Sequence, residues 1–210
     1  MKLTEFLREN APYLTTGVLL TFLSSFGQTF FISIFAGHIM GTFELSHGEW
    51  GLIYGVGTFT SAAIMVWAGG LTDRFRVRSL APVILVLLAL ACLGMALNPV
   101  WWGLFVVIFA LRFAGQGMTS HIAIVAMSRW FIATRGRALA IATTGFAVGE
   151  ALLPLIFVAL MVLIDWRILW LVAAVISLLG ILPLLRLLRL ERTPANLAQT
   201  KLSVGMMAAH

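Results

Sequence analysis

Residues 80–97 read LAPVILVLLALACLGMAL, eighteen consecutive positions without a charged side chain. An α-helix needs about 20 mostly apolar residues to cross the roughly 30 Å hydrocarbon layer of a bilayer. This run is bounded by Arg78 on one side and by Asn98 and Pro99 on the other, which are residue types that punctuate apolar segments. The stretch therefore predicts a membrane-spanning helix.

Five more apolar runs accompany this helix. We expect the other spans at 13–37, 50–71, 101–128, 138–164 and 166–188. Of the 210 residues, 61% are hydrophobic and 10% are charged, which excludes an ordinary soluble domain. The runs lack the alternating pattern of barrel strands, so the predicted fold is an all-α integral membrane protein in a lipid bilayer. We expect residues 13–188 to form one six-helix bundle, with 1–12 as a cytoplasmic N-terminal tail and 189–210 as a cytoplasmic tail.

Basic side chains are sorted between the two sides of the predicted spans. If the N-terminus is cytoplasmic, the segments on that side carry twelve of the 14 Lys and Arg residues. The opposite side carries only Arg167, and Arg112 lies within a span. Because loops rich in Lys and Arg stay in the cytoplasm, this count predicts a cytoplasmic N-terminus. The net charge of +6 therefore indicates membrane orientation, and nucleic-acid binding is not expected.

The first and second spans carry polar side chains and the third carries almost none, and the same order recurs in the fourth, fifth and sixth spans. The second and fifth spans each also carry two glycines four apart, Gly51 with Gly55 and Gly145 with Gly149. Small residues at this spacing let helix backbones touch, so we expect both pairs to pack helices. The pattern predicts two three-helix units arranged as inverted repeats, with a chance distribution of the polar residues as the alternative.

The loop after the second span reads GGLTDRFRVR from Gly69 to Arg78. It places one carboxylate, Asp73, among three arginines at a helix end. Such a carboxylate can exchange ion-pair and helix-terminus partners at small cost, and it can therefore hold one conformation against another. The loop indicates a conformational latch, with an ordinary positively charged loop as the alternative.

The same loop resembles the signature G-x-L-x-D-R-x-G-[RK]-[RK] that lies between the second and third helices of the major facilitator superfamily. It matches at Gly69, Leu71, Asp73, Arg74 and Arg78, whereas Arg76 stands where the signature has its second glycine and Val77 where it has a basic residue. The resemblance implies that Gly69, Asp73, Arg74 and Arg78 together form the latch.

Two further stretches resemble the same superfamily. Residues 112–117, RFAGQG, are similar to the R-x-x-x-[QG]-G run of its fourth helix, and DWR at 165–167 opens the sixth span in the manner of that family. The resemblance implies that the chain is the N-terminal six-helix half of a transporter, with 189–210 as the start of the central loop. It also implies a second six-helix half, on the same or a partner chain, and a bacterial inner membrane as the location.

Two charged residues, Arg112 and Glu150, are predicted inside spans. At about 1.5 Å per residue each lies roughly 16 to 18 Å from a span end, near the midplane. A charge there costs ~2.5–3.5 kcal/mol on insertion scales. A structural ion pair between the two is one explanation. The other is a central solute and proton pathway that also includes Gln28 and Gln116, in which Arg112 holds a carboxylate or other anion and Glu150 carries a coupling proton.

These features predict a secondary active transporter that moves a small solute by alternating access, in its specific form a proton-coupled organic anion, by symport or antiport. The alternatives are a truncated fragment without independent activity and a six-span channel, the latter because Asn98-Pro99-Val100 resembles one copy of a water-channel box. No G-x-S-G run of an intramembrane protease occurs, so we expect no enzyme. His38, His47 and His121 lack metal-ligand spacing, so we expect neither a metal nor a cofactor.

Overall fold

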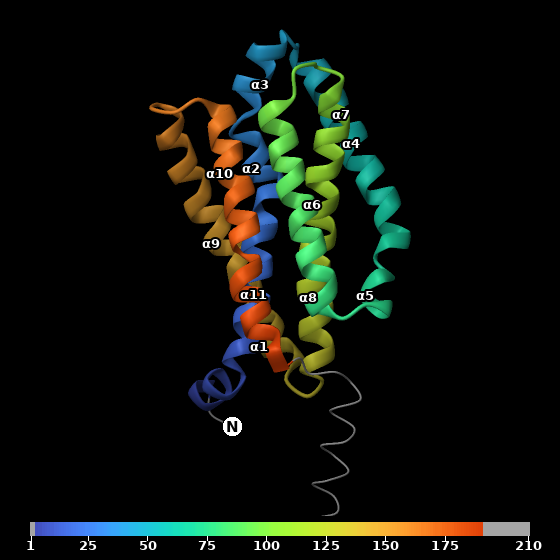
Figure 1. Ribbon diagram of the computed structural model, residues 1–210, viewed down its shortest axis with the longest axis vertical. Helices are drawn as coiled ribbons and strands as arrows, with labels where there is room; N and C mark the ends of the chain where they lie inside the picture. Colours follow the sequence, from blue (N-terminus) through green and yellow to red (C-terminus); the bar gives the residue numbers. More distant parts are fainter. Residues whose placement is uncertain (1–2, 191–210) are drawn as a thin grey trace, which may run out of the picture.

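The computed structural model describes residues 3–190, and this part of the chain is helical and contains no strand. Six of its segments are long and apolar enough to cross a membrane, and they run along one another in a single bundle (Figure 1). The prediction of an all-α membrane protein with six spans is therefore confirmed. In chain order the six spans are Leu3–Ser33, His47–Arg74, Val77–Leu97, Gly103–Trp130, Arg135–Met161 and Trp166–Leu187.

Several spans are assembled from more than one helical segment. Span 1 consists of α1 (Leu3–Leu23), η1 (Ser24–Gly27) and α2 (Thr29–Ser33), and span 2 of α4 (His47–Ala68) and α5 (Leu71–Arg74). Span 3 is the single helix α6 (Val77–Leu97), and span 5 is the single helix α9 (Arg135–Met161). Span 4 consists of α7 (Gly103–Leu111), η2 (Arg112–Thr119) and α8 (Ser120–Trp130). Span 6 consists of α10 (Trp166–Leu179) and α11 (Ile181–Leu187). The short α3 (Ala36–Phe43) lies between spans 1 and 2, and η3 (Leu188–Leu190) follows span 6.

Span 1 is the one whose limits differ most from the prediction, because its helix begins ten residues earlier and ends four residues earlier than expected. Spans 2 to 6 begin and end within three residues of the predicted limits, but helix α1 begins at Leu3 rather than at 13. Phe6 is buried there, with its ring centroid 5.7 Å from that of Phe131 in an edge-on arrangement, and the side-chain amide of Asn10 donates to the Phe6 carbonyl at 2.9 Å. A buried aromatic ring thus holds a polar segment against the bundle. The expected tail at 189–210 lies almost entirely outside the described residues.

The helices pair in a regular way. Helix α1 packs along α9, α4 packs against α7 and η2, α6 packs along α10, and α1 also contacts α8. The three principal pairs, between spans 1 and 5, 2 and 4, and 3 and 6, are unchanged if the first three spans are exchanged with the last three, whereas the contacts of α6 with α7 and of α8 with α9 have no equally extensive counterpart. This pairing is the one expected of two equivalent three-span units, and their inverted relationship stays a prediction.

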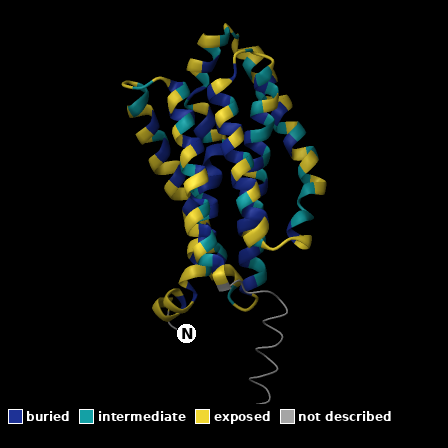
Figure 2. Cartoon of the chain, in the orientation of Figure 1, coloured by how far each residue is buried: buried dark blue, intermediate teal, exposed yellow. Residues whose placement is uncertain are grey.

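Spans 2 and 5 are the least buried of the six. Only 17% of span 2 and 22% of span 5 lie inside the bundle, against 39% or more for each of the others. Their helices, α4 and α9, lie at the two flanks of the view in Figure 1 and carry much exposed surface in Figure 2. Large apolar side chains such as Phe59 and Trp67 on α4, and Leu155 and Val162 beside or on α9, are exposed.

An aromatic cluster joins spans 1, 5 and 6 near one end of the bundle. The ring of Phe31 lies 4.9 Å from that of Phe157 on α9 and 5.3 Å from that of Trp170 on α10. Phe35 and Phe26 extend the cluster on either side. Edge-on aromatic pairs contribute about 0.5–1.5 kcal/mol each beyond their buried area, so this cluster fixes the upper part of span 1 against its neighbours.

Arg167 joins three elements at the same end. Its Nη1 donates to the carbonyls of Ala96 at 2.9 Å and Asn98 at 2.8 Å, where α6 ends. Its guanidinium lies over the rings of Trp166, at 4.7 Å, and Phe43, at 5.7 Å. The start of α10 is thereby tied to the end of α6 and to α3.

Candidate functional site

Two spans leave regular α-helical geometry where they cross in the middle of the bundle. In span 1 the helix tightens into the 3₁₀ turn η1, and Gln28 then takes an extended conformation with φ −81° and ψ 155° before α2 begins. In span 4 the segment η2, Arg112–Thr119, is wound as a π-helix. Irregular backbone at membrane depth is tolerated where it is buried in protein or lines a cavity, and π turns are frequent at functional sites. The crossing is therefore the natural place to look for a binding site.

Glycines make the crossing possible. A Cβ atom on Gly27 would overlap the Leu111 carbonyl oxygen and would lie 2.7 Å from the Cα of Gly115. A Cβ atom on Gly115 would in turn lie 2.5 Å from the Cα of Gly27. Real Cβ atoms do not tolerate such distances, so the two backbones touch because both residues lack a side chain.

Arg112 is buried at this crossing and is held by span 1. Only 7% of the residue is exposed, and its Nη1 donates to the Gly27 carbonyl at 3.3 Å and to the Thr29 hydroxyl at 3.0 Å. The Tyr54 hydroxyl on α4 donates to the same Thr29 oxygen at 3.0 Å, and the Arg112 guanidinium lies 5.6 Å from the Tyr54 ring centroid. We call Thr29, Tyr54 and Arg112 the arginine cluster.

The arginine cluster has an unused donor. Within the described structure the Nε atom of Arg112 is buried and has no hydrogen-bond partner. A buried guanidinium normally satisfies all its donors, because each unpaired polar group in a low-dielectric interior costs about 1–3 kcal/mol or more. An acceptor on a bound molecule, such as a carboxylate oxygen, would satisfy this one.

The two glutamines proposed for the pathway flank the arginine cluster. Gln28 is half-buried between Gly27 and Thr29, and Gln116 is exposed one helical turn beyond Arg112 on η2. Neither side-chain amide is hydrogen-bonded to Arg112 in the described structure. Both are thus near the cluster without being part of it.

Glu150 does not join Arg112. The carboxylate is exposed on α9, and the one salt bridge among residues 3–190 is formed elsewhere, by Asp73 and Arg129. Glu150 directly follows Gly149, which packs on α1, so its side chain projects about 100° away from that packed face. The structure therefore corrects the suggestion that the two midplane charges form a structural ion pair.

The two glycine pairs differ. A Cβ atom on Gly145 would overlap Thr21 Oγ1 and the Val18 carbonyl, and one on Gly149 would overlap Ser25 Oγ, so this pair lies directly against α1. Gly51 and Gly55 have no atom of a neighbouring element within 4 Å of the Cβ position. They make no close contact within the described bundle, because α4 turns that face outwards, and their role in helix packing stays a prediction. Gly57 lies against α7 instead, where an added Cβ atom would be 2.8 Å from the Ile108 side chain.

The proposed latch has a partner that the loop itself does not contain. Arg129, on α8, donates from Nη2 to Asp73 Oδ1 and from Nη1 to the Thr72 carbonyl. Arg74 and Arg78 are exposed and form no ion pair with Asp73 in the described residues. Gly69 lies beside His121, whose Nε2 would be 3.4 Å from a Cβ atom there. The loop is thus attached to span 4 through Arg129 rather than to its own arginines.

Comparison with known proteins agrees with this geometry. The family model described as Major Facilitator Superfamily matches residues 17–204, most of the chain. The chain belongs to the major facilitator superfamily. No curated protein and no solved structure matches it. It is therefore a membrane transporter of the major facilitator type, as the loop motif and the run in the fourth span suggested.

Some residues that form the site of this major facilitator protein were not identified from its sequence. Thr29 was not singled out, and Arg129 was counted only as a basic residue near a membrane surface. Gly115 was part of the motif in span 4, but no spacing connected it to Gly27, which is 88 positions away. In each case the partner lies on another helix, and a single sequence does not reveal which turns of two helices face each other.

Proposed function

We propose that this major facilitator protein is a secondary active transporter of a small organic anion, coupled to protons, and that Arg112 is the anion-binding group. The observation that carries the proposal is the buried Arg112 guanidinium with a free Nε–H donor in the middle of the bundle. A planar guanidinium can offer two parallel donors to a carboxylate, which gives both affinity and orientation.

The surroundings of Arg112 favour an organic anion over a bare inorganic one. The hydroxyls of Thr29 and Tyr54 are hydrogen-bonded to each other, and Thr29 is exposed, so the cluster has polar groups that an entering solute can reach. The ring of Trp50 lies 5.9 Å from that of Tyr54 and offers an apolar contact for a carbon skeleton. Sites of this kind combine a few polar groups that orient the ligand with apolar walls that bind its body.

The coupling and the access change involve other residues. Glu150, an acidic residue at membrane depth without a cationic partner in the described residues, carries the coupling proton in this proposal. The Asp73–Arg129 pair holds one conformation. Its side chains are 70% and 38% exposed, so the pair is worth about 0–1 kcal/mol and can break and re-form at small cost.

The exposed faces of α4 and α9 are the surfaces on which a second six-helix half would pack. Phe59, Trp67 and Leu155 are more than two-thirds exposed, and exposure alone would also suit lipid. The outward-facing pair Gly51 and Gly55 favours helix packing, because small residues four apart allow close approach. We place the N-terminus in the cytoplasm and the protein in a bacterial inner membrane on the basic-residue count and the family.

Uptake into proteoliposomes tests the proposed function. The purified protein is reconstituted and screened with small mono- and dicarboxylates, with and without an inward proton gradient. We expect saturable uptake that the gradient increases, and Arg112→Lys should raise KM about 10- to 100-fold because it keeps the charge but loses the two parallel donors. Arg186→Lys on α11, at an exposed position, is the matched control and should leave KM unchanged.

The outcomes separate the alternatives. Uptake that is not saturable would indicate a channel. Absence of uptake by this chain, together with uptake when a second six-helix half is supplied, would indicate a fragment that needs its partner. Carboxylate uptake with the same KM for the parent and for Arg112→Lys would contradict the assignment of Arg112 as the anion-binding group.

A further inference from the structure

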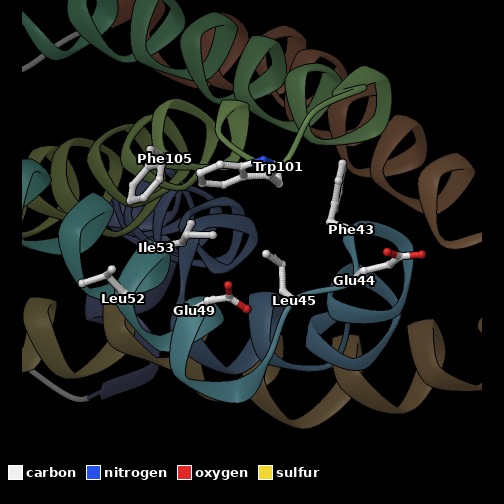
Figure 3. A pocket seen from close by; sticks show the side chains of 8 residues that line it. All are labelled: Phe43, Glu44, Leu45, Glu49, Leu52, Ile53, Trp101 and Phe105. Atoms are coloured by element: carbon white, nitrogen blue, oxygen red, sulfur yellow. The ribbon is translucent and has the colours of Figure 1, made fainter.

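A cavity of about 530 Å³ lies at the end of the bundle where α3 meets α4 and where α7 begins. Figure 3 shows the rings of Trp101 and Phe105 along one wall and Leu45 and Glu49 across from them, with Phe43 at one side. Its volume is within the range of about 300–1,000 Å³ that is usual for small-molecule sites. This cavity is built from other residues than the arginine cluster.

The charge of this cavity is wholly negative. Its lining includes the two carboxylates of Glu44 and Glu49 and no basic side chain. Arg167 lies against the ring of Phe43, but its guanidinium is bound to the carbonyls of Ala96 and Asn98. The cavity therefore attracts cations and repels anions.

Glu49 has a free acceptor atom. It is the third residue of α4, and its Oε2 accepts hydrogen bonds from the Ser46 backbone N–H at 2.8 Å and from the Ser46 hydroxyl at 2.7 Å. This capping box holds the side chain in place at the helix start. Both bonds converge on one oxygen, so Oε1 is available to a ligand in the cavity.

We propose that this cavity binds an organic cation with an apolar body, such as a quaternary phosphonium or ammonium compound. The faces of Trp101, Phe105 and Phe43 attract a cation through their ring quadrupoles and also bury its carbon substituents. Glu49 supplies the opposite charge across from the rings, and Glu44, whose carboxylate points away from them in Figure 3, adds to the negative charge of the lining. A metal ion would leave the aromatic walls without a contact, and among the described residues no three His, Cys, Asp or Glu side chains are grouped so that they could hold one.

The position of the cavity suits an amphiphilic ligand. Trp101 is 52% exposed and lies just before α7, at the start of span 4. Leu52 is 64% exposed and lies near the start of α4 in span 2. Tryptophans at span ends lie at the level of the lipid headgroups, where amphiphilic cations accumulate. A ligand can therefore enter from the membrane interface. The inference depends on this cavity alone and does not require that Arg112 binds an anion.

Direct binding of tetraphenylphosphonium tests the proposal. The intact chain is placed in nanodiscs of zwitterionic lipid, and binding is measured by equilibrium dialysis after subtraction of empty nanodiscs. We expect one saturable site per chain. Glu49→Gln removes the charge, but glutamine still satisfies the capping box, and it should weaken binding about three- to tenfold. Trp101→Ala should weaken it by a similar factor.

Matched variants serve as controls. Trp102→Ala removes the neighbouring exposed tryptophan, which does not line the cavity, and Glu9→Gln removes a carboxylate from α1. Both should bind tetraphenylphosphonium as the parent does. Tetraphenylborate, which has the same shape and the opposite charge, should not displace it. Thermal unfolding of each variant verifies that it is folded, and Glu44→Gln is a second charge variant outside the capping box.

Three results would overturn the proposal. One is the absence of saturable binding. Another is equal affinity in the parent and in folded Glu49→Gln, Glu44→Gln and Trp101→Ala. The third is displacement by tetraphenylborate as effective as displacement by unlabelled tetraphenylphosphonium, since recognition would then be apolar and independent of charge. None of these results bears on carboxylate uptake, so failure here is distinguishable from failure of the anion site.

Discussion

Gly115 approaches Gly27 so closely that a methyl group on Gly115 would lie 2.5 Å from the Gly27 Cα atom. The contact joins the 3₁₀ turn of span 1 to the π-helical segment of span 4. Arg112 begins that segment and donates to the Gly27 carbonyl at 3.3 Å. The position of the buried charge thus depends on a contact between two backbones.

Gly115→Ala should destabilise the protein. The added methyl group meets backbone atoms that cannot rotate away, and such overpacking costs about 1–3 kcal/mol or more. Thermal unfolding in detergent can be followed through Cys92, the one cysteine, which is fully buried and will react with a thiol reagent only after unfolding.

Gly51→Ala is the control for this measurement. It has no neighbour within 4 Å and lies in helix α4, so it should be neutral or stabilising by up to about 1 kcal/mol. Equal melting temperatures for Gly115→Ala and the parent would show that the helices can separate slightly without cost.

Asp73→Asn should slow transport while leaving folding intact. The pair with Arg129 is partly exposed, so its loss changes stability by about 1 kcal/mol or less. If the pair holds one conformation, its loss shifts the equilibrium between states, and coupling of this kind changes rates or affinities by roughly 5- to 100-fold. The initial rate of uptake in proteoliposomes measures the effect, and Arg186→Gln, at an exposed position of α11 outside the latch, is the control.

The exchanged pair Asp73→Arg, Arg129→Asp provides a second test of the same contact. It keeps opposite charges at the two positions, so uptake should recover in part relative to either single variant. Recovery will be incomplete because the exchanged aspartate cannot donate to the Thr72 carbonyl as Arg129 does. A double variant as slow as the worse single variant would indicate that Asp73 acts through another partner.

Arg112 and Glu150 should contribute to stability independently. The structure gives them no contact, so the destabilisation by Arg112→Ala and by Glu150→Gln should add within about 0.5 kcal/mol in the double variant. A structural ion pair would instead make the double variant more stable than that sum. In uptake assays, Glu150→Gln should abolish the dependence on the proton gradient and leave downhill uptake of the solute. An unchanged gradient dependence would exclude Glu150 as the proton carrier.

Single cysteines should report the orientation of the protein. In a Cys92→Ala background, Arg76→Cys and Arg135→Cys should be protected from an impermeant thiol reagent added to intact cells, and Glu44→Cys should react. All three positions are exposed in the structure, so protection reflects the side of the membrane rather than burial. Labelling with the opposite pattern would reverse the assigned topology.

The sequence predicted the spans well because apolar length is a local property. Five of the six spans have their limits within three residues of prediction, and the exception is a polar segment held by one ring, that of Phe6. The close packing at Gly145 and Gly149 could also be predicted, because two small residues four positions apart are recognisable in the sequence. Gly51 and Gly55 have the same signature but face outwards, since spacing does not tell which face of a helix turns into its own bundle.

The site was only half predictable for a related reason. An arginine inside an apolar span is conspicuous, so Arg112 was found. Its partners, Thr29 and the Gly27 carbonyl, belong to a turn where span 1 departs from helical geometry, and no helical periodicity extends across such a turn. Glu150 was paired with Arg112 on depth alone, and depth does not specify rotation about the helix axis.

Arg167 changes how the distribution of basic residues should be weighed. It is the one arginine assigned to the side opposite the other loops, and its guanidinium is bonded to the carbonyls of Ala96 and Asn98, which the end of α6 leaves without helical donors. A cation at a helix C-terminus also lies favourably in the field of the helix dipole. Arg167 therefore has a local architectural role, as a cap for a different helix. An arginine in a loop indicates the orientation of a chain in the membrane only when its guanidinium is free of structural hydrogen bonds. An arginine such as Arg167, which caps a helix, does not carry that information.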